Sequence, residues 1–250
     1  MHVEGVYVDP NGKKFFIPVE NNPEILASLA QDLGVSPKLA FHDVYSIDEP
    51  ELLALIPRPS HALIFITPPE MYNDSRKEDG IATKVALENA SYTTAEGVVW
   101  YPQTIGHACG LIALLHSLAN GKSRDYVIKG TFLDTLLTET KPMVPKDRAD
   151  ALYNSQPLEE AHMRAAKRGD SAPPSAAEDP GYHYIAFIKG DDGHLWELEG
   201  GVDGPIDRGM LGEGDDVLSE TALHLGVRKF LKHANGNLNF SIVALAEAKE

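Results

Sequence analysis

The pattern of hydrophobic and polar positions predicts helices and strands that alternate along the chain. Apolar residues recur at helical spacing over 25–33, behind Asn22-Pro23-Glu24, which is typical of a helix N-terminus. Gly34 then ends this helix. The other elements predicted in the first third of the chain are a short strand or extended segment at 14–19, a helix at 49–55 and an apolar strand at 61–67. A buried strand between helices indicates a mixed α/β fold.

A helix that is apolar on nearly every side is predicted over 106–118. Such a helix is buried at the centre of a domain. The remaining predicted elements are helices at 122–138, 145–155 and 218–233 and strands at 182–189, 194–198 and 238–245. The Gly-Asp-Asp-Gly sequence between two of these strands indicates a hairpin over 182–198.

Large apolar residues nearly disappear between 159 and 180, where Ala, Ser, Pro and charged residues take their place. This composition predicts a mobile loop with bounds of about 156–181. A linker between two domains is the other interpretation, but the roughly 70 residues that follow are few for an independent core. We therefore expect a single domain over residues 1–250.

The net charge limits the classes of partner that we expect, and the lack of long apolar stretches limits the expected cellular compartment. The chain carries 37 acidic against 22 basic residues, a formal charge of -15. This charge argues against nucleic acid or an anionic membrane as the main partner and favours a basic protein. No apolar stretch approaches the roughly 18 to 20 residues of a membrane helix, and the N-terminus lacks the pattern of a signal peptide. We therefore expect an intracellular protein, in the cytoplasm or the nucleus.

The single cysteine, Cys109, excludes an internal disulfide and a multi-cysteine zinc site. It is either a small buried hydrophobe or a nucleophile. It lies three residues into the predicted helix, and a helix N-terminus lowers the pKa of a thiol. Gln103 offers a side-chain amide donor near the helix start, where the oxyanion formed by attack on a carbonyl would lie. The alternative interpretation of Gln103 is a polar residue that leads into the helix.

A nucleophilic thiol needs a base, and the chain has ten histidines. His116 is two helical turns from Cys109, roughly 10 Å, which is too far for a hydrogen bond. His107 is two positions before the cysteine, where side chains diverge around a helix, so it would shape the site without acting as base. His183 begins an apolar strand directly after the predicted loop and is the better choice.

Carboxylates on the partner strand of the hairpin could orient His183. Glu199 would lie directly opposite His183 if the turn held three or five residues centred on Asp191. Opposed Cβ atoms are about 4.5 to 5.5 Å apart, so the carboxylate could then reach the imidazole. Glu197 shares this face and is the fallback. Either glutamate could instead be a solvated strand residue paired with a lysine such as Lys189.

Three motifs in this order resemble the ubiquitin C-terminal hydrolases, a papain-like family of cysteine peptidases. They are QTIGHACGLIALLHSL at 103–118, HYIAFIKGDDGHLWELEG at 183–200 and GPIDRG at 204–209. Two N-terminal segments, FIPVENNPE and DVYSIDEPELLALIPRP, also resemble the family, so the similarity runs from Phe16 to Leu245. The resemblance implies an α+β fold with three layers, α/β/α, around a central antiparallel sheet.

By this resemblance Cys109 is the nucleophile, Gln103 the oxyanion donor and His183 the general base and then acid. Glu199 stands at the position that orients His183. The reaction would run through a thioester between Cys109 and the terminal glycine of ubiquitin. The predicted loop corresponds to the family's crossover loop, so small adducts and short peptides are the expected leaving groups. The family's contacts with ubiquitin map onto Pro18, Val19, Glu20, Glu24, Asp43 and Leu238.

Two positions depart from the family, which usually has Asn where His107 stands and Asp where Glu199 stands. One residue is also inserted in the turn before Glu199. A glutamate can orient a catalytic histidine, and its extra length could offset a shifted hairpin. The primary hypothesis is a monomeric deubiquitinating cysteine hydrolase without metal or cofactor. The alternative is a catalytically weak ubiquitin-binding protein that sequesters or protects ubiquitin.

Overall fold

The structure is a computed structural model that describes residues 3–82, 97–169, 176 and 181–249. Its centre is a six-stranded sheet in the order β3-β8-β4-β5-β6-β7, in which every pair of neighbours is antiparallel. The strands are β3 Leu39–Asp43, β4 Ala62–Thr67, β5 His183–Lys189, β6 His194–Leu198, β7 Ile206–Met210 and β8 Ser241–Glu247. A separate two-stranded hairpin, β1 Tyr7–Val8 with β2 Lys14–Phe15, lies near the N-terminus.

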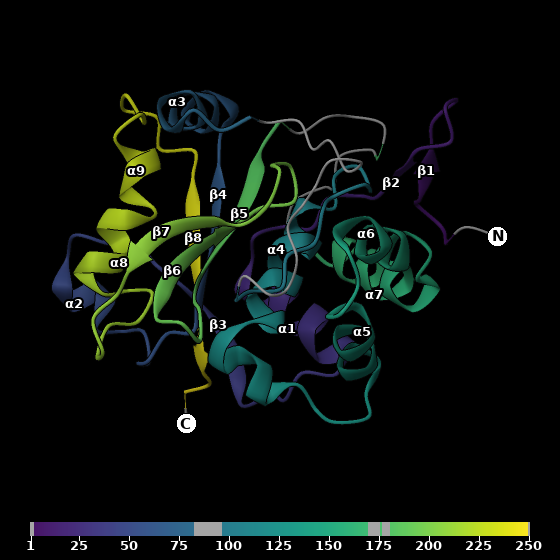
Figure 1. Cartoon of the computed structure of the whole chain (residues 1–250), viewed down its shortest axis with the longest axis horizontal. Coiled ribbons are helices and arrows are strands. Elements are labelled where there is room, and N and C mark those ends of the chain that lie inside the picture. The colour runs from purple at the N-terminus through teal and green to yellow at the C-terminus, as the bar shows by residue number, and fades with distance from the viewer. Residues whose placement is uncertain (1–2, 83–96, 170–175, 177–180, 250) are drawn as a thin grey trace.

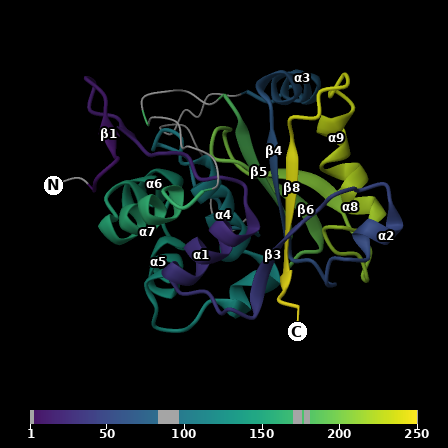
Figure 2. The same ribbon diagram turned by 180° about the vertical axis from the view of Figure 1, so that it is seen from behind.

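Helices cover both faces of this sheet (Figures 1 and 2). One layer holds α1 Pro23–Leu33, α4 Cys109–Ala119, α5 Phe132–Thr140, α6 Pro145–Tyr153 and α7 Gln156–Ala166. The other layer holds α2 Pro50–Leu53, α3 Pro69–Asp79, α8 Glu220–Leu225 and α9 Arg228–Leu231. The three-layer α/β/α arrangement around an antiparallel sheet confirms the predicted fold class. Within the described residues, no helix is long and apolar enough to span a bilayer.

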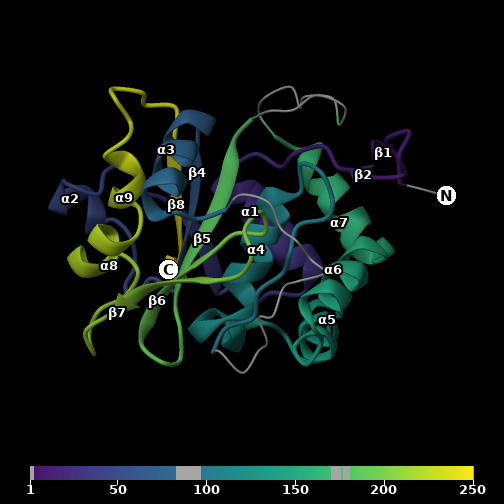
Figure 3. The same cartoon turned by 45° about the horizontal axis from the view of Figure 1, so that its top comes forward.

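Successive residues of the central strands point alternately into two apolar cores, one on each face. On β5, Ile185 and Phe187 pack in the core that contains residues of α3 and α9, whereas Ala186 and Ile188 pack in the core that contains α4. Because both faces are covered, these strands are almost continuously apolar. The alternation also sends the side chain of His183 toward α3. Figure 3 shows α3 and α4 on opposite sides of β5.

The helix α1 forms as its sequence predicts. The Asn22 side chain caps it by accepting from the backbone N–H groups of Glu24 and Ile25, and Pro23 occupies the first turn. Gly34 ends it in the left-handed conformation, with φ of 114°. This well-capped helix lies directly after residues 16–22 and fixes where that segment runs past the start of α4.

The central helix begins three residues later than predicted, at Cys109. His107 has a positive φ of 58°, which interrupts the helical conformation. Gly106 is held instead against the N-terminal hairpin, where its N–H donates to Lys14 and its carbonyl accepts from Phe16. A Cβ at Gly106 would lie 2.0 Å from the ring of Phe15, so this approach requires glycine.

The predicted loop at about 156–181 is wrong in its first part, because residues 156–166 form α7. Ser155 caps this helix by accepting from the Leu158 N–H. Its buried residues are Leu158, Glu159, Ala161, His162, Met163, Ala165 and Ala166, and the three alanines allow α7 to pack closely on α1. Small apolar residues gave too weak a pattern to suggest this helix. The rest of the loop, 170–175 and 177–180, lies outside the described residues.

Other boundaries differ from the sequence pattern at glycines and short polar segments. The predicted helix 122–138 is divided into the 3₁₀ helix η3 Gly121–Tyr126 and α5, because Gly130 has φ of 77° and Thr131 caps α5. The predicted helix 218–233 is likewise interrupted at Gly226, between α8 and α9. Besides β1 and α7, the described residues contain three elements that were not predicted, β3, α3 and β7, and all three carry charged side chains.

Candidate active site

The predicted catalytic residues line one cavity of about 330 Å³. Cys109 comes from the start of α4, His183 from the start of β5 and Glu199 from the end of β6. Gln103 reaches the cavity from the segment that leads into α4. The other lining residues are Tyr72, Asn73, His107, Tyr182, Tyr184 and Gly201. Cys109 and His183, which are 74 positions apart in the sequence, thus line the same cavity at a helix start and a strand start.

Cys109 occupies the first turn of α4, where backbone N–H groups lack helical acceptors and the helix dipole is positive. Burial nevertheless raises the pKa of its thiol to about 11, and the negative charge of Glu199 acts in the same direction. Backbone hydrogen bonds from Tyr184 and Gly110 oppose this rise. The resting thiol is therefore protonated at neutral pH, and it needs a base to become a nucleophile.

Gln103 is fixed beside the helix start by its backbone. Its N–H donates to the carbonyl of Gly200 at 2.9 Å, and its side-chain Nε2 donates to the carbonyl of Ile105 at 3.2 Å. A Cβ at Gly200 would lie 2.7 Å from both Cβ and N of Gln103, so this approach requires a glycine. Because a side-chain amide has two N–H donors, the second remains for an oxyanion near Cys109.

His183 pairs with Thr67 at the edge of the β4–β5 ladder, and its imidazole stacks on the ring of Tyr72. The ring centroids are 3.8 Å apart and the planes differ by 10°. Tyr72 belongs to α3 and is 2% exposed. The imidazole is therefore supported face to face by an aromatic ring from the layer opposite α4.

The hairpin register differs from the one expected. The Gly190 N–H donates to His194, and Lys189 pairs with Leu195, so the three-residue turn is centred on Asp192 instead of Asp191. Continuing this register sets Glu199 opposite Ile185 rather than opposite His183. The extra residue of the turn shifts the partner strand, but Glu199 stays on the face that His183 uses.

The carboxylate of Glu199 is held by two residues of α3. Both of its oxygens lie 2.9 Å from the hydroxyl of Tyr72, and Oε2 lies 2.8 Å from a guanidinium nitrogen of Arg76. Burial raises the pKa of Glu199, while the charge of Arg76 opposes that rise. Burial and Glu199 together raise the pKa of Tyr72 above its usual range, so its hydroxyl remains a donor.

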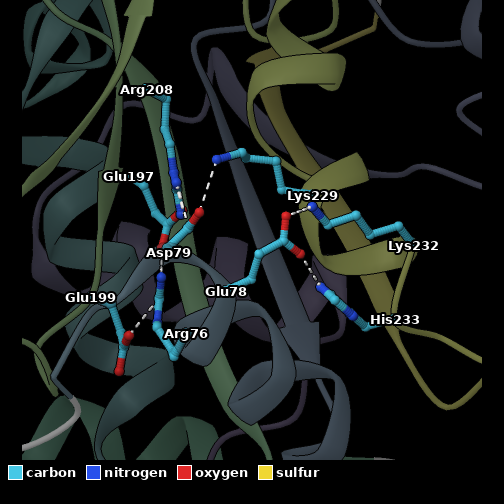
Figure 4. A network of polar contacts seen from close by, with 9 residues as sticks. All are labelled: Arg76, Glu78, Asp79, Glu197, Glu199, Arg208, Lys229, Lys232 and His233. Carbon is cyan, nitrogen blue, oxygen red and sulfur yellow. Dashed lines mark hydrogen bonds and ion pairs between the residues drawn. The ribbon is translucent and has the colours of Figure 1, made fainter.

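Glu197, the fallback for Glu199, belongs to an ion network behind the cavity (Figure 4). Its carboxylate pairs with Arg76 at 2.5 Å and with Arg208 at 2.6 Å. Arg208 and Lys229 both pair with Asp79, so the network joins α3, β6, β7 and α9. The side chain of Glu197 is fully buried. It is committed to these arginines and therefore serves the packing of α3 against the sheet.

Sequence reasoning missed Tyr72 and Arg76, although α3 has a recognisable pattern. Pro69 and Glu70 stand at its first turn, and Gly80 ends it in the left-handed conformation. Its buried residues are Met71, Tyr72, Ser75 and Arg76, which recur at helical spacing. Two of the four are polar or charged, so the hydrophobic pattern alone was too weak to predict the helix.

Two other histidines near Cys109 have structural surroundings. His116 is fully buried, accepts from the Tyr101 N–H at 2.9 Å, and has its pKa lowered to about 3 by burial. His107 packs its ring edge-on against Phe15, with centroids 5.3 Å apart, at the rim of the cavity. The burial of His116 and the packing of His107 on Phe15 favour the roles predicted from the sequence, a structural residue and a residue that shapes the site.

The residues expected to contact ubiquitin divide into two groups. Glu20, Glu24 and Asp43 border one surface hollow, and Leu238 is 81% exposed. Val19, in contrast, is only 3% exposed, and its carbonyl accepts from the Tyr184 hydroxyl. The acidic residues therefore present a negative surface, whereas Val19 contributes to the packing behind Cys109.

Comparison with known proteins gives consistent matches. Residues 16–232 match the family described as "Ubiquitin carboxyl-terminal hydrolase, family 1". Ubiquitin carboxyl-terminal hydrolase YUH1 of Saccharomyces cerevisiae is 31% identical over 240 residues, covering 92% of this chain and 94% of the relative. The human isozyme L1 is 32% identical over 231 residues, covering 92% of this chain and 98% of the relative.

A solved structure shares the fold at lower sequence identity. It is the catalytic domain of Trichinella spiralis UCH37 bound to ubiquitin vinyl methyl ester, with a TM-score of 0.71 and 21% identity. The match covers 93% of this chain and 95% of that one. At this level the similarity concerns the fold.

Proposed function

The chain belongs to the ubiquitin carboxyl-terminal hydrolase family and is a thiol-dependent deubiquitinase, and from this premise we propose how its residues divide the work. Cys109 is the nucleophile, His183 the base and then acid, and Gln103 the oxyanion donor. The observation that carries this proposal is the shared cavity, in which a thiol at a helix start faces a stacked imidazole. Glu199 keeps its predicted role in orienting His183.

The reaction follows from these positions in two steps. His183 accepts the thiol proton as the sulfur of Cys109 attacks the carbonyl carbon of the terminal glycine of ubiquitin. The bond to the leaving group then breaks, His183 gives the proton to the leaving amine, and a thioester remains. Water, deprotonated by His183, hydrolyses the thioester. In both steps the oxyanion accepts from Gln103 and from backbone N–H groups at the start of α4.

We propose that ubiquitin binds across the acidic hollow and that its basic tail enters the cavity. The carboxylates of Glu20, Glu24 and Asp43 support this placement, because a negative surface attracts a basic partner. Pro18 and the exposed Leu238 are proposed as neighbouring contacts. Small adducts and short peptides remain the proposed leaving groups. The net charge supports a protein without nucleic acid or membrane partners, and we propose a monomer of the cytoplasm or nucleus.

Hydrolysis of ubiquitin with a fluorogenic C-terminal amide tests the assignment. Cys109→Ala and His183→Asn should each lose at least about 1000-fold in kcat/KM, because nucleophile and base act as a unit. His194→Asn is the matched control, since His194 lies at the other end of the hairpin and pairs with Asp207. Turnover that survives Cys109→Ala would refute the mechanism.

The alternative of a weak ubiquitin-binding protein is favoured by one observation, the engagement of Glu199 with Tyr72 and Arg76. The same assay separates the two functions. A wild-type protein that binds ubiquitin tightly but turns over the amide no faster than Cys109→Ala would establish the alternative.

A further inference from the structure

Tyr72 contacts two of the proposed catalytic residues at once. Its ring stacks on the imidazole of His183 at 3.8 Å, and its hydroxyl donates to the carboxylate of Glu199 at 2.9 Å. The residue is 2% exposed and lines the cavity that contains Cys109. Because the two planes differ by only 10°, the larger ring covers one face of the imidazole and restricts its movement toward α3.

Arg76, one helical turn after Tyr72, holds the other end of this arrangement. Its guanidinium binds Oε2 of Glu199 at 2.8 Å and lies 4.8 Å from the centroid of the Tyr72 ring. The second arm of the guanidinium pairs with Glu197, which is itself fully buried. The ion pair with Arg76 therefore holds the Glu199 carboxylate in place. The hydrogen bond between this carboxylate and Tyr72 then sets the position of the tyrosine hydroxyl.

We propose that Tyr72 is a positioning residue for His183 and that Glu199 and Arg76 hold Tyr72 in place. The inference rests on the proposed function in one respect, the assignment of His183 as the base. Glu199 then orients the imidazole through the tyrosine ring. The shifted hairpin supports this indirect route, because it places Glu199 opposite Ile185, two residues along β5 from His183.

The hydroxyl of Tyr72 suits this role throughout the neutral pH range. Burial and the neighbouring Glu199 raise the pKa of Tyr72, so the phenol keeps its proton and continues to donate. The residue donates to a carboxylate on one side and presents its ring to an imidazole on the other. It fixes the base but takes up no proton from Cys109.

Alkylation of Cys109 by iodoacetamide tests the inference without ubiquitin. The chain has one cysteine, so the alkylation rate reports on this thiol alone. Tyr72→Phe keeps the ring and removes the hydroxyl. We expect its alkylation rate at pH 7.5 to fall about 10-fold and its apparent pKa to rise, because a displaced imidazole stabilises the thiolate less. With the ubiquitin amide, kcat should fall about 10-fold while KM stays within about 2-fold.

The matched control is Tyr126→Phe. Tyr126 also donates its hydroxyl to a glutamate, Glu247, at 2.7 Å, and its ring also lies near a histidine, His61, at 5.6 Å. This second cluster is at the opposite end of β4 from Tyr72, outside the cavity. Loss of the Tyr126 hydroxyl should leave the alkylation profile of Cys109 and kcat unchanged. A profile for Tyr72→Phe that matches that of Tyr126→Phe would overturn the inference.

A double-variant cycle distinguishes the indirect route from direct contact. If Glu199 acts through Tyr72, the variant with both Tyr72→Phe and Glu199→Gln should be no slower than the slower single variant. If Glu199 acts on His183 directly, the two losses should multiply, and the inference fails. Circular dichroism checks the fold. Should Tyr72→Phe not fold, Glu199→Gln is compared with Glu247→Gln by alkylation. Loss of the Glu199 charge alone would speed the reaction, so a rate for Glu199→Gln that does not fall overturns the inference.

Different results would refute the hydrolase function and the positioning role of Tyr72. A wild-type protein that does not hydrolyse the ubiquitin amide refutes the proposed function, but its alkylation profile still answers whether Tyr72 sets the environment of Cys109. A wild-type protein that hydrolyses the amide, with no alkylation or kcat difference for Tyr72→Phe, refutes only the positioning role.

Discussion

Cys109 and His183 face the same cavity, but they are held there by different kinds of interaction. Cys109 begins α4, in which residues 110–118 are all buried, mainly in the apolar core. His183 lies against Tyr72 on α3, which is fixed to the sheet by the ion pairs of Arg76, Glu197, Glu199 and Arg208. We call these the nucleophile side and the histidine side.

The difference predicts how each side responds to substitution. A substitution that shortens a buried apolar side chain removes the contacts of the deleted atoms. Neighbouring side chains then move partly into the cavity that is left. A buried ion network responds more steeply, because removing one member leaves the others charged and unpaired in a medium of low polarity. The histidine side therefore depends on a few charged residues, whereas the nucleophile side depends on many apolar contacts.

Arg76→Met is expected to have the largest effect on stability. It removes the cation shared by Glu197 and Glu199 while keeping an apolar side chain of similar length, and breaking a buried pair in this way costs about 3 to 5 kcal/mol. Urea unfolding followed by circular dichroism measures the change. Arg164→Met is the control, because the Arg164–Asp32 pair is on the surface and contributes at most about 1 kcal/mol. Equal losses would show that the network is not what holds α3.

Leu114→Ala is the corresponding change on the nucleophile side. Leu114 is fully buried in α4, so we expect a loss of about 2 to 4 kcal/mol in the free energy of unfolding. Leu55→Ala, at a site that is 53% exposed, should cost well under about 1 kcal/mol and serves as control. A loss for Leu114→Ala that exceeds that of Arg76→Met would reverse the comparison.

The same difference explains what the sequence could predict. The helices of the nucleophile side, α1 and α4, were predicted from their hydrophobic periodicity. Only the start of α4 was wrong by three residues, because His107 has a left-handed backbone conformation. The histidine side was only half predicted. His183 and Glu199 were found from their places in the predicted hairpin and from the family motifs, but Tyr72 and Arg76 were not predicted.

The physical reason is that burial of charge depends on partners distant in sequence. Arg76 is buried because Glu197 and Glu199 neutralise it, and these lie more than 100 positions away. From local pattern alone, an arginine on a polar helix is expected to be exposed. The hairpin register failed for a similar reason, since the centre of the turn is decided by hydrogen bonds around Gly190 and Gly193 that spacing does not specify.

His116→Gln probes the nucleophile side through pH. The buried His116 has its pKa lowered from 6.5 to about 3, so the native state resists a proton that the unfolded chain binds. Its contribution to stability is complete above pH 6.5 and is lost as pH falls toward 3. Between pH 7 and pH 5 the wild type should lose about 2 kcal/mol from this residue. Gln can accept from the Tyr101 N–H without titrating, so urea unfolding of His116→Gln should lack this loss.

Exposed histidines provide the control for that measurement. His224 lies on the short helix α8, and His224→Gln should retain the wild-type loss of stability between pH 7 and pH 5. If both variants showed the same pH dependence as the wild type, the acid sensitivity would not come from α4.

Glu199→Gln should reveal the opposite sign on the histidine side, with a smaller effect. Burial raises the pKa of Glu199 in the folded state, so its favourable contribution is complete below the unfolded pKa and is lost as pH rises through the folded pKa. The stability of Glu199→Gln relative to wild type should therefore improve as pH rises above about 4.5. The exposed Glu247→Gln should show no such trend in urea unfolding midpoints. A relative stability that declines with rising pH would mean that Arg76 outweighs burial and holds the carboxylate ionised, which would make Glu199 a permanent negative charge behind His183.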